Sequence, residues 1–289
     1  MGEQLKIAYL GPVATFTHQA ARQAFGRGAR YIPAETIGDV FSMVEQGYAH
    51  RGVAPVENSN EGVVTSTLDL LVDSELFISG EVIIPIRLML LSMEEDIARI
   101  RTVYSHPQAL AQCRNWLERN LSEAKIKDAR STAEAAALSA EMRGTAAVAG
   151  ELASEIYEVP ILVEDIGDWE ENLTRFLVFS GERSPSTGSD KTSIVMTIKD
   201  RVGALYEILR PFGERGINLT KIESRPSRKK AWDYLFFVDF DGHREDPHIK
   251  NTLDKVREYC IDLKILGSYP KGSVGAAQQR EGKATGIPG

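Results

Sequence analysis

The sequence predicts an α/β protein of two domains, the second of which is ferredoxin-like. The chain has 289 residues, more than one average domain needs to bury its own core. From Leu5 to Val163, short apolar runs alternate with amphipathic stretches, the pattern of strands covered by helices. After residue 191 the expected order is strand, helix, strand, strand, helix, strand, which is the ferredoxin-like arrangement. These observations place one domain at 1–182, a linker at 183–191 and a second domain at 192–270.

The expected elements follow from apolar periodicity, and two helix starts have local chemical support. Ser131 is followed three residues later by Glu134, a capping box, and Pro107 after His106 suits a first helical turn. Strands are expected at 7–10, 52–56, 83–91, 102–105 and 146–149, and helices at 17–25, 37–46, 67–72, 107–120 and 133–142. In the second domain, strands are expected at 192–198, 217–224, 233–239 and 263–266, and helices at 203–215 and 247–259.

The second domain is expected to make a homodimer. A four-stranded ferredoxin-like sheet leaves one face or edge free for pairing with a second copy. A dimer and a tetramer both remain open on this evidence. The tail 271–289 is rich in glycine, alanine and glutamine without an apolar period, so we expect it to be disordered.

Composition argues against several classes of protein. The net charge of −7 offers no broad positive surface for nucleic acid, and the basic run 225–230 is best interpreted as a solvated hairpin turn. Cys113 and Cys260 are far apart in the sequence, so we expect reduced thiols and a cytoplasmic protein. The first residues lack the apolar run of a signal peptide, and no segment approaches membrane-spanning length, so no membrane partner is expected.

No common cofactor motif is present. The sequence lacks the glycine-rich loops that cradle nucleotide phosphates, and its five histidines form no HExxH motif. We therefore expect neither a metal nor a cofactor. A GxSxG hydrolase elbow is also missing.

Polar residues cluster where the expected strands run out into loops, the usual location of ligand groups in α/β domains. The clusters lie at 11–18, 55–62, 105–108 and 171–176. Taken singly, each allows a local explanation: Thr15 as a helix cap, Asn58-Ser59 as a turn, His106 at a helix terminus. The sequence Thr174-Arg175-Phe176 is harder to explain locally because a hydroxyl, a fixed cation and an aromatic ring stand side by side.

Together these motifs resemble those of the prephenate dehydratases of the stand-alone bacterial type. The resemblance spans nearly all of Leu5 to Tyr269. The matching motifs, in the order of the family, are Gly-Pro-x-x-Thr-Phe from Gly11, Pro-Val-Glu-Asn-Ser-x-Glu-Gly from Pro55, Thr-Leu-Asp-Leu-Leu from Thr67, Ser-His-Pro-Gln-Ala-Leu from Ser105 and Asn-x-Thr-Arg-Phe from Asn172. Ala14 stands where the family usually has glycine, and Tyr206 stands where its regulatory motif has valine.

The resemblance implies a two-lobed catalytic domain like a periplasmic solute-binding protein, with the active site between the lobes. One lobe would comprise residues of about 1–80 and 160–182, and the other about 81–159. The family's reaction converts prephenate to phenylpyruvate, CO₂ and water without a cofactor, because aromatisation drives it.

The resemblance also implies roles for the residues in these motifs. Thr174 would hydrogen-bond to or protonate the leaving oxygen, and Arg175 would fix a substrate carboxylate. His106 stays open as an alternative proton donor, because its ordinary pKa lies near neutrality. The other expected substrate-binding residues are Phe176, Asn58, Ser59, Glu57, Thr15, Ser105, His106 and Gln108.

In the second domain, two motifs resemble those by which ACT domains of this family bind phenylalanine at a dimer interface. Phenylalanine binding there would inhibit the enzyme by linkage between the two sites. The expected allosteric residues are Gly203, Ala204, Leu205, Asn218, Leu219, Glu223, Ser224, Arg225 and Pro226. Two other functions remain open: an arogenate dehydratase, whose substrate carries an amino group in place of the keto group, and a non-catalytic amino-acid sensor.

Overall fold

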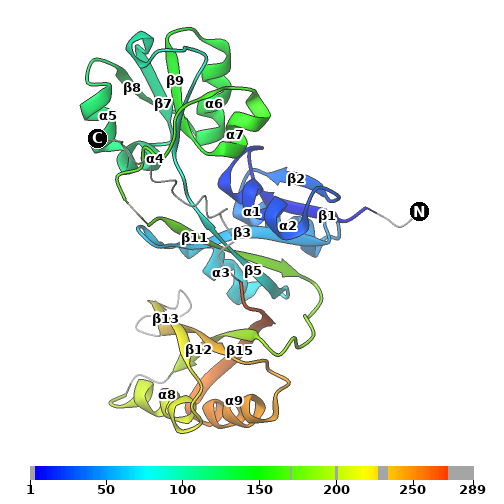
Figure 1. Cartoon of the computed structure of the whole chain (residues 1–289). Helices are drawn as coiled ribbons and strands as arrows, with labels where there is room; N and C mark the ends of the chain where they lie inside the picture. Colours follow the sequence, from blue (N-terminus) through cyan, green and yellow to red (C-terminus); the bar gives the residue numbers. More distant parts are fainter. Residues whose placement is uncertain (1–3, 170, 199–200, 227–233, 273–289) are drawn as a thin grey trace, which may run out of the picture.

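The computed structural model describes residues 4–169, 171–198, 201–226 and 234–272, and its strands form three sheets (Figure 1). Two sheets belong to the two lobes of the first domain, and the third belongs to the C-terminal domain. In Figure 1 the second lobe lies at the top, the first lobe in the middle and the C-terminal domain at the bottom.

The first lobe is built on a mixed sheet in the order β2-β1-β3-β11-β5, with β4 paired to β3. The strands β1, β2 and β3 are parallel, whereas β11 runs antiparallel to both β3 and β5. The elements of this lobe are β1 (Lys6–Leu10), α1 (Phe16–Phe25), β2 (Arg30–Ala34), α2 (Ile37–Glu45), β3 (Arg51–Asn58), β4 (Gly62–Val63), α3 (Thr65–Asp73), β5 (Phe77–Pro85) and β11 (Leu173–Ser180).

The second lobe has a five-stranded sheet in the order β10-β6-β9-β7-β8. An alanine-rich helix, α6, packs on it, because small side chains allow the helix and the sheet to approach closely. The elements are β6 (Met89–Ser92), the 3₁₀ helix Ile97–Arg99, β7 (Thr102–Ser105), α4 (Pro107–Gln112), α5 (Arg114–Asn120), β8 (Lys125–Asp128), α6 (Thr132–Glu141), β9 (Thr145–Ala149), α7 (Glu151–Tyr157) and β10 (Ile161–Val163).

The chain crosses between the lobes twice, and the crossings differ from the expected boundaries. The apolar run 83–91 is two strands, because β5 ends at Pro85 and β6 starts at Met89 in the other lobe. β5 pairs with β11 and so belongs to the first lobe, while β10 pairs with β6 and belongs to the second. The two crossings are tied together by the Ile86 N–H, which donates to the Asn172 carbonyl at 2.7 Å.

The expected helix at 107–120 is also two helices. Its second part, α5, starts after Cys113, where the Asp168 carboxylate accepts hydrogen bonds from the N–H groups of Asn115 and Trp116 at 2.8 and 3.1 Å. A carboxylate at these positions stabilises a new helix start. No local sequence pattern reveals this break, because Asp168 lies far along the chain.

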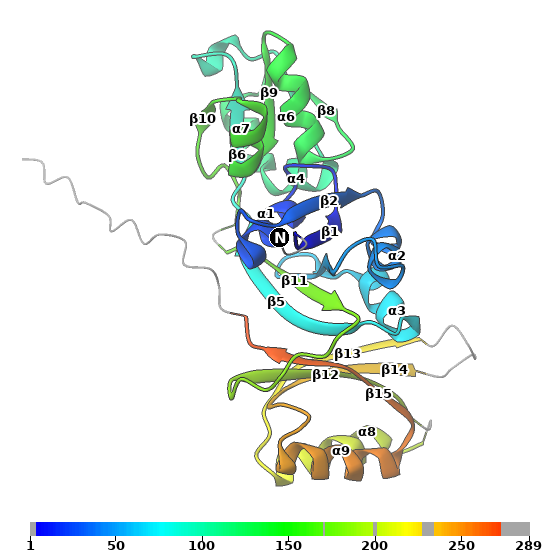
Figure 2. The ribbon, with the colours of Figure 1, turned by 90° about the vertical axis from the view of Figure 1, so that its right-hand side faces the viewer.

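The C-terminal domain has the expected βαββαβ order and a sheet in the order β13-β14-β12-β15. Its elements are β12 (Asp190–Ile198), α8 (Ala204–Glu214), β13 (Leu219–Pro226), β14 (Tyr234–Asp241), α9 (Pro247–Tyr259) and β15 (Cys260–Pro270). Figure 2 shows both helices on one face of this sheet, with the other face turned toward the first lobe. The face that the sequence suggested was free for a second copy is therefore covered by the same chain, and only edges remain.

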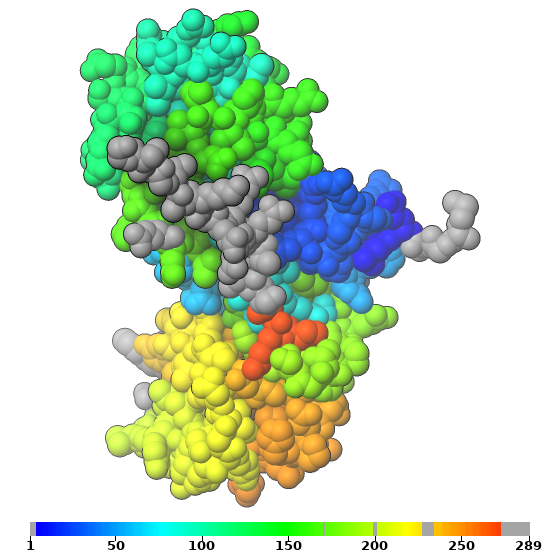
Figure 3. Space-filling model, in the orientation of Figure 1, coloured from blue at the N-terminus to red at the C-terminus, as the bar shows by residue number. Residues whose placement is uncertain are grey.

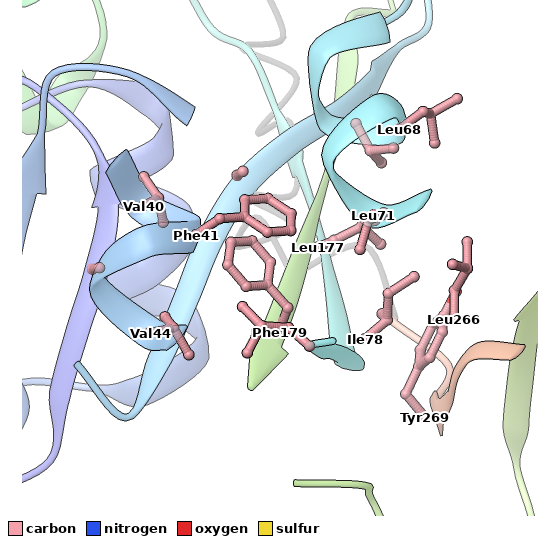
Figure 4. Close-up of a cluster of buried hydrophobic side chains, with 14 of the residues drawn as sticks. Val40, Phe41, Val44, Leu68, Leu71, Ile78, Leu177, Phe179, Leu266 and Tyr269 are labelled. Carbon is pink, nitrogen blue, oxygen red and sulfur yellow. The ribbon is translucent and has the colours of Figure 1, made fainter. Parts of the chain in front are cut away.

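The first lobe and the C-terminal domain share one hydrophobic core. Val195, Phe237, Leu266 and Tyr269 of the C-terminal sheet join the cluster that surrounds Phe41 and Phe179 in the first lobe. Figure 4 shows Leu266 and Tyr269 beside Ile78. At the closest point, a Cβ atom on Gly267 would lie 2.1 Å from the Ile78 carbonyl oxygen, so this strand contact requires glycine. On the face drawn in Figure 3, the yellow-to-red surface of the C-terminal domain directly adjoins the first lobe.

The last strand is longer than the strand expected at 263–266, and the first two residues of the expected disordered tail make contacts with the folded chain. β15 reaches Pro270, the Lys271 ammonium contacts Asp241 at 2.8 Å, and the Gly272 N–H donates to Glu81 at 2.9 Å. The rest of the expected disordered tail, and most of the expected basic turn at 225–230, lie outside the described residues. Among the described residues, no helix is both long and apolar enough to cross a membrane.

Candidate active site

A cavity of about 380 Å³ lies between the two lobes. The first lobe lines it with the start of α1, the end of β3 and the start of β11, and the second lobe lines it with α4 and the start of α6. Among the expected site residues, Thr15, Asn58, His106, Gln108, Thr174 and Phe176 all border this cavity.

The pairing of β3 with β11 brings Asn58 and Thr174 together. The two residues are cross-strand partners, and the Asn58 Nδ2 atom donates to the Thr174 hydroxyl oxygen at 2.8 Å. The Asn58 Oδ1 atom accepts from the backbone N–H groups of Asn60 and Glu61 at 2.9 and 3.1 Å. These two bonds fix which end of the Asn58 amide faces Thr174.

The Thr174 hydroxyl is therefore an acceptor toward the protein and keeps its own proton for another partner. Thr174 is 8% exposed, and the described residues include no acceptor for its O–H group. A hydroxyl that accepts one hydrogen bond still has one proton to donate. Because Thr174 lines the cavity, this proton is available to a ligand that binds there.

The second lobe contributes the N-terminal ends of two helices. The His106 Nδ1 atom accepts from the Gln108 N–H at 3.4 Å, so Nε2 is the ring nitrogen available to a ligand. Ser131 caps α6 by accepting from the Glu134 N–H at 3.0 Å.

The first lobe contributes a third helix start: Thr15 caps α1 by accepting from the His18 N–H at 3.3 Å. α1 and α6 thus both start at the cavity wall, and their partial positive charges favour bound carboxylates. Arg130 is the cationic side chain among the described residues that line the cavity, and its guanidinium contacts Glu134 at 2.7 Å.

Arg175 and Glu57 point away from the cleft, contrary to the expectation that they contact substrate. Successive side chains of a strand alternate between its faces, and Arg175 is the cross-strand partner of Glu57, just as Thr174 is of Asn58. The Arg175 guanidinium contacts Glu81 and Asp239 at 2.6 Å each, and donates to the Tyr269 hydroxyl at 2.9 Å. Both residues therefore lie at the boundary with the C-terminal domain, with Glu57 2.7 Å from the Lys221 ammonium.

Two expected serines also have structural partners in place of a ligand. Ser105 is fully buried, and its hydroxyl donates to the Val148 carbonyl at 2.6 Å in the core of the second lobe. The Ser59 hydroxyl accepts from the Leu173 N–H at 3.0 Å and so joins β3 to β11. Neither residue borders the cavity.

The first loop keeps a glycine-like conformation despite Ala14. The φ angle of Ala14 is 72°, in the left-handed region that favours glycine. The Ala14 N–H donates to the His18 Nδ1 atom at 3.1 Å, and the methyl group is buried in the second-lobe core. The loop thus tolerates the methyl group by burying it.

No site role was predicted from the sequence for three residues at the cleft, Arg130, Gln112 and Asn172, although Asn172 opens one of the matching motifs. Arg130 and Gln112 line the cavity. Asn172 bonds both to Asn58 and to Gln112, at 2.7 and 2.9 Å. A signal existed for Gln112, because it follows Gln108 by four residues and so shares one helical face with it.

The expected allosteric residues fall on α8 and β13 of the C-terminal domain. Gly203 has a φ of 81° and precedes α8, whose first residues are Ala204 and Leu205. Leu219, Glu223, Ser224 and Pro226 lie along β13, and the Asn218 amide contacts Asp241 at 3.4 Å. Arg225 reaches the first lobe instead, where its guanidinium contacts Asp69 at 2.7 Å and donates to the Thr65 carbonyl at 2.6 Å.

No group of three or more His, Cys, Asp and Glu side chains is arranged to hold a metal within the described parts of the chain.

Comparison with known proteins identifies the family. Residues 7–184 match the family model of prephenate dehydratase, and residues 192–258 match that of the ACT domain. The chain belongs to the prephenate dehydratase family. It is 52% identical over 269 residues to a bifunctional chorismate mutase/prephenate dehydratase of Aquifex aeolicus, an alignment that covers 93% of this chain and 74% of the relative.

Solved structures agree with this assignment of the family. The prephenate dehydratase of Arthrobacter aurescens in complex with L-Phe superposes with a TM-score of 0.83 at 36% identity, over 92% of this chain and 90% of that one. GqqA, described as a novel type of quorum quenching acylase, superposes with a TM-score of 0.84 at 29% identity, over 92% and 97% of the two chains. The expected two-lobed fold with a ferredoxin-like ACT domain is thereby confirmed.

His18, which anchors the first cleft loop, predicts a pH dependence of stability. Burial and the nearby Arg22 guanidinium lower the pKa of His18 from about 6.5 to about 4. Between about pH 6.5 and 4, His18 is therefore protonated in the unfolded chain and neutral in the folded chain. The free energy of unfolding should be constant above pH 6.5 and should fall as the pH is lowered from about 6.5 to 4. Urea unfolding of the wild type and His18→Gln across this range measures the effect. An identical slope in both proteins would contradict it.

Proposed function

We propose that this chain is a prephenate dehydratase, a lyase that converts prephenate to phenylpyruvate, CO₂ and water. The observation that carries the proposal is the Asn58–Thr174 pair, which leaves one hydroxyl proton available beside a cavity between two lobes. Family membership supports the same reaction.

In the proposed reaction the carbon–carbon bond to the ring carboxylate breaks and CO₂ leaves. Its electron pair enters the ring as the bond to the ring hydroxyl breaks, and the ring becomes aromatic. Thr174 donates its hydrogen bond to the departing oxygen, which leaves as hydroxide and takes a proton from solvent to become water, while Thr174 keeps its own proton. A threonine hydroxyl is a weak acid, so its contribution is a preorganised donor at the atom where negative charge develops.

We propose that the cleft holds the two substrate carboxylates at its helix N-termini. Prephenate carries one carboxylate on the ring and one on the side chain, and α1 and α6 begin on opposite sides of the cavity. Arg130 adds a cation on the α6 side. His106 and Gln108 would contact the ring or the side chain, and His106 stays the alternative proton donor.

Dehydration fits the cleft better than the acyl transfer implied by the name of GqqA. A hydroxyl nucleophile needs a basic side chain to take its proton. In the described residues, the side-chain partner of Thr174 is the Asn58 amide NH₂, which is itself a donor. Arogenate differs from prephenate at the side chain alone, and the ratio of kcat/KM for the two substrates decides between them.

Replacing Thr174 tests the proposed donor. Thr174→Val keeps the shape of the side chain and removes the hydroxyl, so kcat for prephenate should fall about 10²- to 10³-fold, the usual loss for one such donor. Thr174→Ser keeps the hydroxyl and should retain most of the activity. Steady-state kinetics of both proteins, with circular dichroism as a control for folding, measure this. Full turnover by folded Thr174→Val would refute the assignment.

We further propose that phenylalanine binds the ACT domain and inhibits the enzyme. The Arthrobacter relative was solved with L-Phe, and the expected allosteric residues of this chain lie at the start of α8 and along the edge strand β13. Leu205, Tyr206, Ile222 and Tyr234 are exposed apolar side chains in the same region. An exposed apolar patch beside a free strand edge supports a homodimer formed there.

The proposed inhibition has a short route to the cleft through β13. Lys221 and Arg225 lie on the same face of this strand and contact Glu57 and Asp69 at 2.7 Å each. Glu57 precedes Asn58 in β3, and Asp69 lies in α3, which follows the cleft loop. A shift of β13 on phenylalanine binding would therefore pull on both ends of the segment that carries Asn58.

Lys221→Met tests this route by removing one of the two ion pairs. The variant should keep kcat within about twofold, while the phenylalanine concentration for half-inhibition should rise at least about fivefold, a typical allosteric coupling. Lys250→Met, on the exposed side of α9, is the matched control. Calorimetry should still detect phenylalanine binding. Unchanged inhibition of Lys221→Met would overturn the route.

We propose a cytoplasmic location for the enzyme. Both cysteines are free, and burial raises the pKa of the Cys113 thiol to about 12, so this thiol is unreactive. Reduced thiols of this kind support a reducing compartment.

A further inference from the structure

The Gln112 side chain bridges the two lobes at the edge of the cleft. It projects from α4 of the second lobe and contacts two residues of the first. Its Nε2 atom donates to the Glu61 carboxylate at 2.6 Å, and its Oε1 atom accepts from the Asn172 Nδ2 atom at 2.9 Å. The bridge therefore exists only when the lobes stand at this spacing.

The same hydrogen bonds continue inward to the Thr174 hydroxyl. The Asn172 Oδ1 atom accepts from Asn58 Nδ2 at 2.7 Å, and Asn58 Nδ2 donates its other proton to Thr174 at 2.8 Å. Three side chains, those of Gln112, Asn172 and Asn58, thus connect a carboxylate at the rim, Glu61, to the hydroxyl inside the cleft.

The chemistry of the groups fixes the direction of this chain. An ionised carboxylate only accepts, so Gln112 must present its NH₂ group to Glu61 and its oxygen to Asn172. Asn172 must then present its NH₂ group to Gln112 and its oxygen to Asn58. That oxygen takes one of the two Asn58 protons, and the second is left for Thr174. Reversing any amide would set two donors or two acceptors against each other.

We propose that Gln112 and Glu61 are positioning residues, which align Asn58 and hence the Thr174 hydroxyl when the lobes close. This inference rests on the proposed dehydratase function. Backbone N–H groups already decide which end of the Asn58 amide faces Thr174. Gln112 and Asn172 set where that NH₂ group lies, because Asn58 Nδ2 also donates to the Leu173 carbonyl at 3.3 Å, and the shorter bond to Asn172 at 2.7 Å holds the amide against that pull.

A second bridge between the lobes provides an internal control. Arg22 of α1 and Glu155 of α7 form an ion pair at 3.2 Å on the outer surface. Neither residue is a member of the hydrogen-bonded chain that leads to Thr174. If lobe contact alone mattered, removing either bridge would have a similar effect on turnover.

An exchange of the two rim residues tests the proposal. In Gln112→Glu, two carboxylates face each other and no NH₂ group is available for Glu61. We expect kcat to fall about 10- to 100-fold, with KM within about threefold, because a small misplacement of catalytic groups has an effect of this size. Glu61→Gln alone should lose less turnover than Gln112→Glu, because its amide oxygen can still accept from Gln112 although the amide no longer fixes the direction of the chain.

The double variant Glu61→Gln/Gln112→Glu should recover most of the lost turnover. The amide at position 61 would donate to the carboxylate at 112, so the repulsion between two carboxylates is removed and the side chain at 112 can again accept from Asn172 in its original position. Glu155→Gln should leave kcat within about twofold of the wild type. If Gln112→Glu fails to fold by circular dichroism, Gln112→Met replaces it as the variant that must lose turnover.

Two results would overturn the positioning role: full kcat in the folded Gln112 variants, or a double variant as slow as Gln112→Glu. A wild-type protein without activity on prephenate would instead refute the proposed function itself. The two failures are therefore distinguishable.

Discussion

The alternation of side chains along two paired strands organises the functional structure of this protein. Where β3 meets β11, Asn58 pairs with Thr174 and Glu57 pairs with Arg175. Because adjacent residues of a strand face opposite sides, the first pair enters the cleft and the second faces the ACT domain. The proposed catalytic hydroxyl and an interdomain cation are thus held by neighbouring residues of one strand, so a displacement of one residue displaces the other.

The second pair lies in a buried ionic network that joins the domains. Arg175 contacts Glu81, Asp239 and Tyr269, and Lys191 contacts Glu81 at 2.8 Å. Removing one partner from such a network leaves an uncompensated buried charge, which costs about 3–5 kcal/mol. Together with the shared apolar core, this network makes the ACT sheet a structural support of the first lobe. Regulation by such a domain requires only small shifts, because packed interfaces transmit displacement.

Much of the fold could be predicted from the sequence, because its signals are local. Periodicity revealed the αβ alternation and the βαββαβ order, and α9 starts and ends where the pattern indicated. The predicted bounds of strands and helices are wrong where residues far apart in the sequence determine where an element ends. The apolar run 83–91 conceals a crossing between lobes, and Asp168 divides the helix expected at 107–120. The period-two alternation of a strand could have placed Arg175 and Thr174 on opposite faces. Both were assigned to the substrate site because they are adjacent in one motif. Asn172 and Gln112 were missed because their importance lies in contacts across the cleft.

The central claim is that Asn58 acts through the Thr174 hydroxyl, and a double-mutant cycle on kcat/KM for prephenate tests it most directly. Asn58→Ala should slow the wild-type background strongly and the Thr174→Val background little, because the group that it orients is already gone. Equal losses in both backgrounds would show that the two residues act independently and would contradict the account.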